Sequence, residues 1–409
     1  MIQNDPGTRS NRRRSLRRRR VWKRVLIVVL ILAVGGGATF FIARKASHKG
    51  GRAAGAPAVP QNTVLVAMTS HSDPSGQASA LTLLGVDKTG KNPVTLFLPV
   101  DALAPIPGAK DFDLIGKALA NGSRTLQQIT VENLMGIDIN RIVSIDDVSL
   151  GVFIDQLGGI DVNVQEKLFT TQPDGTQTLA FQLGEHHMNG AAAITYLTYQ
   201  DPNANQLDAF VRSQKVWEGI FNAASNGAKL SSAIASLGAS QVAAEDGQFL
   251  QSIIAAFAAA SSGDRTYQVL PGQEVGGGGS DTSYQVDDAK LADLVRANFA
   301  GSVPYGVTIG ARQKVQLLNG NGTPELGQRA AVLLVPAGLR IELTGNAQTF
   351  NYRSTRIIIY GNDAPALALG QEIRNLLGVG TVEVGTTSQT VVNVTVVLGK
   401  DFLTKIKGS

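Results

Sequence analysis

The chain contains no cysteine and is poor in aromatic and charged side chains. Of its 409 residues, 6% are aromatic, 17% are charged and four are histidine. The absence of cysteine excludes disulfide bonds, cysteine metal ligands and cysteine nucleophiles. Hydrophobic residues make up 43% of the chain, which is too many for a disordered protein. The length predicts roughly two or three domains, and their stability must come from buried apolar cores.

Several catalytic motifs are also missing. No G-x-S-x-G sequence is present, so a hydrolase nucleophile elbow is not predicted. The glycine run Val275–Ser280 lacks the Lys and Ser/Thr of a phosphate-binding loop and indicates a flexible loop. His186 and His187 are adjacent and lack the spacing of a helical zinc motif. The turn at Gly320 and Gly322 lacks the third glycine of a dinucleotide fingerprint, which favours a structural turn over an anion site.

The basic charge is confined to one end of the chain. The net charge is +5, but residues 1–60 hold 14 Lys/Arg and one acid, which leaves 23 basic and 31 acidic groups in residues 61–409. Phosphate binding needs clustered cations on the folded part, so no nucleic-acid partner is expected. Residues 1–24, which carry these arginines, form too short a segment for a folded DNA-binding unit. They indicate a topology determinant beside an anionic membrane leaflet.

A long apolar run follows these arginines. Val25–Ala43 comprises 19 residues without a charge, or about 28 Å of helix against a hydrocarbon core of roughly 30 Å. We predict a single transmembrane helix there, with residues 1–24 as a basic tail in the cytoplasm. Residues 44–61 are rich in Gly, Ala and Pro and indicate a flexible stalk. The alternative is a cleaved signal peptide, whose apolar region is usually shorter, about 7–15 residues.

The residues after the stalk are predicted to form two folded domains outside the membrane. Residues 62–300 alternate strand-like and helical patterns, which predicts an α/β (α+β) domain with a sheet covered by helices on both faces. The strand-like runs are Val64–Met68, Ala80–Val86, Val94–Pro99 and Ile160–Val164. Helical periodicity occurs at residues 125–135, 147–157, 208–222 and 249–257.

Residues 301–311 are expected to be a linker, and residues 312–402 a small α/β domain that folds alone. Its expected strands are Val315–Leu318, Ile357–Tyr360 and Val391–Leu398. One helix is expected to begin at Thr323–Glu325, where a capping residue precedes a proline. A second is expected over Ala364–Leu377.

An ordered set of motifs resembles the LytR-CpsA-Psr (LCP) family of cell-envelope proteins. Phe153–Val162 (FIDQLGGIDV) is similar to the family's LGG signature, Val131–Ile139 to the preceding helix end, and Met188–Tyr196 to a G-x-x-A-L-x-Y segment. Residues 312–402 resemble the LytR C-terminal domain, through Leu318–Gly320 and Val394–Asp401. The order of anchor, stalk, LCP module and C-terminal domain also matches.

The resemblance implies a fold, a ligand and a reaction. The implied fold is a membrane-anchored mixed sheet with an apolar tunnel for a polyprenyl tail. The implied activity moves a glycopolymer from polyprenyl pyrophosphate to peptidoglycan, outside the cytoplasmic membrane. In such a reaction arginines bind the pyrophosphate, carboxylates hold Mg²⁺, and a carboxylate activates the acceptor hydroxyl.

The chain departs from the family pattern at charged positions. The family's P-R-D is here Pro99-Val100-Asp101, which keeps only the aspartate. Both arginines of Y-x-R-x-R are replaced in Tyr196-Leu197-Thr198-Tyr199-Gln200. An Asp-Thr pair aligns with Ser79-Ala80, an earlier Asp with Thr69-Ser70, and an Arg with Ala209. Bound Mg²⁺ is therefore doubtful, because its carboxylate ligands are substituted.

A few candidate site residues remain. Asp101 is the candidate catalytic and metal-binding carboxylate, with a turn residue as the ordinary alternative. Arg212, Gln214, Lys215 and Lys117 are the candidate phosphate-binding residues, with solvated surface side chains as the alternative. Phe, Ile and Trp on the helices at 210–221 and 249–257 favour an ordinary core, which is compatible with their also lining a lipid tunnel.

Two functions of different classes stay open. The first is an envelope-facing LCP-like protein with an eroded pyrophosphate and metal site. It would bind a polyprenyl-linked glycan or a wall polymer, or assist an active LCP paralogue. The second is an active phosphotransferase with a rearranged site. A third, a transcriptional attenuator, conflicts with the predicted topology.

Overall fold

The computed structural model describes residues 58–109, 112–121, 123–171, 174–199, 206–238, 241–276, 282–387 and 389–407. The basic tail, the predicted transmembrane helix and most of the predicted stalk lie outside these residues. Within the described part, no helix is both long enough and apolar enough to cross a bilayer.

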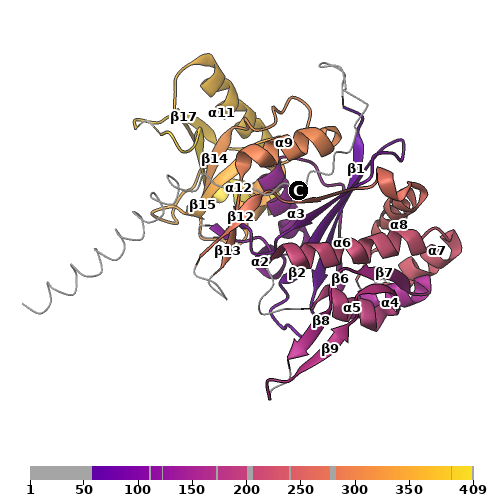
Figure 1. Cartoon of the computed structure of the whole chain (residues 1–409). Helices are drawn as coiled ribbons and strands as arrows, with labels where there is room; N and C mark the ends of the chain where they lie inside the picture. Colours follow the sequence, from indigo (N-terminus) through magenta and orange to yellow (C-terminus); the bar gives the residue numbers. More distant parts are fainter. Residues whose placement is uncertain are drawn as a thin grey trace, which may run out of the picture. The chain divides into compact units, whose positions relative to one another are not determined.

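The larger domain is built on a mixed five-stranded sheet with strand order β11-β3-β2-β1-β6 (Figure 1). The strands are β1 Gln61–Thr69, β2 Ala78–Asp87, β3 Val94–Leu98, β6 Arg141–Asp146 and β11 Thr266–Val269. β1 and β3 each pair with β2 antiparallel, whereas β6 and β11 join the edges in parallel. The predicted α/β (α+β) class with a mixed sheet is confirmed.

Both faces of this sheet are buried, because successive side chains of a strand point to opposite faces. Val64 and Val66 of β1 pack into one core, and Leu65 and Ala67 into the other. The first core is closed by α4 Asp147–Leu157, α5 Gly190–Leu197, α6 Gln206–Ala223, α7 Gly227–Ser236 and α8 Ala244–Ala259. The second is closed by α3 Arg124–Met135 and α9 Asp288–Asn298.

Short elements decorate this domain. Four two-stranded ribbons pair β4 Leu103–Pro105 with β5 Phe112–Leu114, β7 Ile160–Val164 with β10 Gly184–Met188, β8 Leu168–Thr171 with β9 Gln177–Phe181, and β12 Gly272–Val275 with β13 Ser283–Val286. The remaining helical pieces are α2 Lys117–Asn121, η1 Ser262–Asp264 and η3 Ala300–Ser302.

The C-terminal domain has its own five-stranded mixed sheet, with order β15-β14-β18-β16-β17. Its strands are β14 Lys314–Asn319, β15 Arg340–Asn346, β16 Arg356–Ile359, β17 Thr381–Val384 and β18 Val394–Leu398. Its helices are α10 Leu326–Leu334, α11 Ala364–Leu377 and α12 Lys400–Lys407. The smaller α/β unit expected from the sequence is therefore present.

Several helix boundaries follow local capping chemistry, whereas α8 and α10 begin without a side-chain cap. α4 begins after Asp146, whose carboxylate accepts the Ser149 N–H, and ends at left-handed Gly158. The expected start of a helix at Thr323–Glu325 is wrong, because α10 begins at Leu326. Glu325 adopts φ 63° and makes no side-chain cap. The last strand also starts later than expected, at Val394 instead of Val391.

Candidate functional site

A pocket of about 390 Å³ opens where β1, β2 and β3 meet the connection between α5 and α6. Its larger apolar lining residues are Met68, Leu81, Phe97, Leu98, Leu197 and Phe210. Its polar lining residues are Ser79, Thr82, Asp101, Thr198, Tyr199 and Ser213. The rings of Phe97 and Phe210 stack with centroids 6.3 Å apart across one wall. The pocket therefore offers an apolar interior with hydroxyl groups and one carboxylate.

Several positions where family residues are replaced lie together at this pocket, whereas Thr69 and Ser70 are not among its lining residues and Gln200 lies outside the described residues. Ser79, Ala80, Val100, Thr198 and Ala209 all line it, although they come from four separate parts of the chain. The alignment made from motifs alone thus places five substituted positions around one cavity. Each now presents a hydroxyl, a methyl or an aliphatic group.

Arg212 lies beside the pocket on α6 and is 5% exposed. Its Nη2 donates to the Tyr199 carbonyl oxygen at 2.7 Å, and its guanidinium stands 5.3 Å from the centre of the Tyr199 ring. Its Nε and Nη1 are buried without a hydrogen-bond partner in the described part of the chain. Burial without a bonded acceptor is costly for a cation, so this arginine has unused capacity for an anion.

Asp101 lies in the pocket wall directly after β3. Its backbone carbonyl accepts the Tyr284 N–H at 2.9 Å, which ties this turn to β13. Asp101 is the only charged residue among the pocket-lining residues that the structure describes. Asp101 therefore places a carboxylate in the lining of a largely apolar cavity.

The other three candidates have their polar groups engaged outside the pocket lining. Gln214 Nε2 and Lys215 Nζ both contact the carboxylate of Glu218, at 2.8 Å each. Lys117 Nζ contacts Asp113 at 2.8 Å, one turn away. None of the three lines the cavity. The structure thus brings Asp101 to the pocket and Arg212 beside it, and it leaves the lysines in local ion pairs.

Among the described residues, the pocket lining offers Mg²⁺ a single carboxylate. Mg²⁺ is usually bound through one or two carboxylates together with substrate phosphates and waters. Here Asp101 is the sole carboxylate of the lining, and no group of three or more His, Asp or Glu side chains in the described ranges is placed to hold a metal ion. We derive no chemical step through a metal.

One functional side chain was missed by sequence reasoning. Tyr199 lines the pocket, supports Arg212, and donates its hydroxyl to the Phe169 carbonyl oxygen at 2.6 Å, which ties the pocket to β8. In the sequence it lies between Thr198 and Gln200, the two positions where the Y-x-R-x-R pattern has arginine. An aromatic residue within a pattern that contains arginines could have indicated a contact with an arginine, because guanidinium groups stack on aromatic faces.

The fold is an α/β domain with a pocket of about 390 Å³, followed by a second α/β unit, and family models identify both parts. The model of the LytR_cpsA_psr family matches residues 63–293, more than half of the chain. The model described as LytR cell envelope-related transcriptional attenuator matches residues 312–402. The chain belongs to the LytR-CpsA-Psr family and carries a LytR C-terminal domain.

Curated relatives cover part of the chain. The polyisoprenyl-teichoic acid–peptidoglycan teichoic acid transferase TagU of Enterococcus faecalis is 32% identical over 147 residues, which are 36% of this chain and 46% of that protein. TagU of Bacillus subtilis is 26% identical over 169 residues, 41% of this chain and 53% of that protein. The chain thus spans about half the length of these relatives.

A solved structure shares the fold. The crystal structure of B. subtilis TagV superposes with a TM-score of 0.50 at 18% sequence identity, and it covers 60% of this chain and 98% of TagV. At this identity the likeness shows the fold alone.

Proposed function

We propose that this chain is a membrane-anchored member of cell-wall glycopolymer assembly that binds a polyprenyl-linked glycan or a wall polymer and has lost phosphotransferase activity. The observation that carries the proposal is the convergence of five uncharged substitutions, Ser79, Ala80, Val100, Thr198 and Ala209, on one pocket. The relatives named as teichoic acid transferases support the polymer class.

The charge around the pocket supports binding over catalysis. A pyrophosphate carries at least two negative charges, and each charge-assisted hydrogen bond contributes roughly 1.5–3 kcal/mol. In the described part of the chain, the Arg212 cation contacts the pocket residue Tyr199. The loss of four other arginine positions removes several kcal/mol, or more than about a thousandfold in binding or rate. The apolar interior remains suited to an isoprenoid chain.

The anchor is part of the proposal. Residues 25–43 would cross the cytoplasmic membrane once, with the arginine-rich tail in the cytoplasm and the two folded domains outside. A protein held there could present a lipid-linked glycan to an active LCP paralogue in the same membrane.

An active phosphotransferase is the second candidate, because Asp101 and Arg212 are both retained near the pocket. In that reaction an acceptor hydroxyl of peptidoglycan would attack the phosphorus bound to the glycan. Its proton would pass to Asp101, the bond to the bridging oxygen would break, and polyprenyl phosphate would leave. Such a reaction would have to proceed with a single arginine beside the pocket.

Binding and turnover can be separated with residues 58–409. Trp217 is then the only tryptophan, and it packs in the core that adjoins the pocket. We expect geranylgeranyl pyrophosphate to change its fluorescence, and Arg212→Met to weaken this binding about tenfold or more. Arg374→Met, on the exposed surface of α11, is the matched control. Equal affinity for geranylgeraniol would show that no phosphate is recognised and would contradict the proposal.

A further inference from the structure

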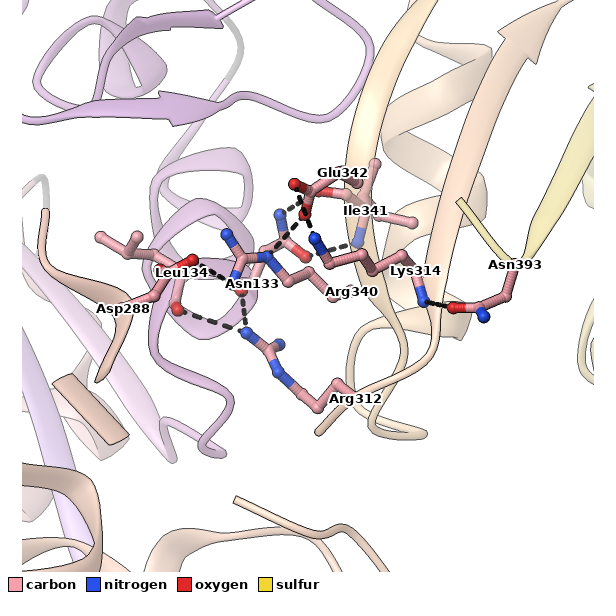
Figure 2. Close-up of polar contacts among 9 residues, drawn as sticks. All are labelled: Asn133, Leu134, Asp288, Arg312, Lys314, Arg340, Ile341, Glu342 and Asn393. Atoms are coloured by element: carbon pink, nitrogen blue, oxygen red, sulfur yellow. Dashed lines mark hydrogen bonds and ion pairs between the residues drawn. The ribbon is translucent and has the colours of Figure 1, made fainter. Parts of the chain in front are cut away.

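The C-terminal end of α3 is held by the C-terminal domain (Figure 2). The side-chain amide of Asn133 donates to the Ile341 carbonyl oxygen at 2.9 Å and accepts the Ile341 N–H at 2.8 Å. Asn133 is 1% exposed. It therefore satisfies both polar groups of one peptide unit of β15, as a neighbouring strand would, from a helix of the other domain.

Arg312 caps the same helix end. Its Nη2 donates to the carbonyl oxygens of Asn133 at 2.7 Å and Leu134 at 3.2 Å. These carbonyls belong to the last turn of α3 and lack helical partners. A cation is favoured there because the helix C-terminus carries partial negative charge. Gly136, at φ 72°, lets the guanidinium lie close, since a Cβ atom there would be 2.8 Å from Arg312 Nε.

A second contact involves residues 106–109, which follow the pocket residue Asp101 in the chain. The Thr344 hydroxyl of β15 donates to the carbonyl oxygen of Ala109 and lies 3.5 Å from that of Ile106. Gly108, at φ 84°, faces the start of α10 so closely that a Cβ atom would be 2.8 Å from Gln328 Cγ. Residues 106–109 are therefore fitted against the C-terminal domain.

The two domains also share apolar and ionic contacts. Ile129 of α3 packs into the core formed by the C-terminal sheet and its helices. Arg340 at the start of β15 forms an ion pair with Asp288 at the start of α9, at 3.1 Å. Residues 58–409 consequently form one compact unit.

Within its own domain, the segment from Asp101 to Ala109 is held by a short ribbon and by the burial of Ala102, Ala104 and Ile106. It includes β4, which pairs with β5 over three residues only. Two-stranded ribbons are marginally stable by themselves. Other main-chain hydrogen bonds of the segment, among the described residues, run from the Tyr284 N–H to the Asp101 carbonyl and from the Ile115 N–H to the Ala102 carbonyl, both at 2.9 Å. The Ala102 N–H also donates to the Pro99 carbonyl, and the Ala109 N–H to the Ile106 carbonyl, both at 3.0 Å.

We propose that the C-terminal domain is a positioning element for the pocket: by docking on α3 and on residues 106–109, it holds the segment that carries Asp101. Asn133, Arg312 and Thr344 are the positioning residues. The role of Asp101 in ligand binding rests on the function proposed above, but the positioning itself does not depend on any ligand.

Hydrogen–deuterium exchange of residues 58–409, without ligand, tests the proposal. In Asn133→Ala and in Thr344→Val, we expect amides within residues 99–116 to exchange at least about tenfold faster, because hydrogen bonds that fix the docking are lost. Amides of β1 and β6 should be unchanged. Asn375→Ala, at an exposed position of α11, is the matched control and should leave residues 99–116 unchanged.

The other outcomes are equally decisive. Faster exchange confined to residues 312–346, or no change in either variant, would overturn the proposal. Asn133→Ala removes a buried amide and can accelerate exchange throughout the chain. In that event Thr344→Val decides, since it preserves side-chain shape, and an unchanged segment 99–116 in that variant would overturn the proposal. Because no ligand is present, failure here is distinct from failure of the proposed function.

Discussion

Glu132 of α3 makes the stability of this protein depend on pH. Its side chain is 4% exposed, and burial raises its pKa from 4.5 to about 7. Asp138 adds to the increase, whereas bonds from Gln128 Nε2 and the Ile139 N–H, both 2.9 Å long, oppose it. No salt bridge to Glu132 occurs in the described part of the chain. Glu132→Gln removes the charge and keeps an oxygen that accepts both bonds.

The size of the effect follows from the pKa difference. Each pKa unit corresponds to 1.36 kcal/mol, so ionisation of Glu132 in the folded state costs about 3 kcal/mol. Between pH 4.5 and about 7 the folded state keeps this proton and the unfolded state does not. Stability must therefore fall as pH rises through this window and level off above about pH 7. The glutamine variant lacks this decrease.

Urea denaturation of residues 58–409 at pH 5, 6, 7 and 8 measures the difference. We expect Glu132→Gln and the parent to have similar free energies of unfolding at pH 5. At pH 8 the variant should be more stable by about 3 kcal/mol. The control is Glu372→Gln, at an exposed site of α11. The reasoning is refuted if parent and variant lose the same stability between pH 5 and pH 8.

Three further substitutions probe packing and the pocket. Gly190→Ala should prevent folding to the native state, because its Cβ atom would overlap the Gly151 carbonyl oxygen. Loss of soluble, cooperatively melting protein checks this. Phe221→Ala removes a fully buried ring stacked 4.3 Å from Phe257 and should lower the free energy of unfolding by about 3–5 kcal/mol in urea. Thr198→Arg places a cation in the pocket wall and should tighten binding of geranylgeranyl pyrophosphate about tenfold or more, measured by Trp217 fluorescence, with geranylgeraniol unaffected.

Local chemistry made much of the fold predictable. The helix over Ala364–Leu377 agrees with α11 residue for residue, because Asp363 caps its start and Gly378 ends it in a left-handed conformation. Apolar runs predicted β1, β2 and β3 because both faces of their sheet are buried. β15 was missed: as an edge strand it alternates charged and apolar residues that contact the other domain.

The site was predictable in its positions and less so in its contacts. Of the positions aligned by motif order, Ser79, Val100 and Thr198 line one pocket, whereas Thr69 and Ser70 do not. The contact of Lys215 with Glu218 could have been predicted from the sequence, since residues three apart on a helix are neighbours. The contact between the Arg212 guanidinium and the Tyr199 ring could not have been predicted, because it depends on how α6 packs against the end of α5.

The central claim is that the pocket binds a lipid-linked glycan without transferring it. The most direct measurement incubates residues 58–409 with a polyprenyl-pyrophosphate-linked sugar, peptidoglycan fragments and Mg²⁺, and follows release of polyprenyl phosphate together with binding of the lipid. We predict saturable binding, weakened in Arg212→Met, with no release above the background of a protein-free sample. Release that depends on this protein and is abolished in Asp101→Ala would contradict the claim and establish an active phosphotransferase.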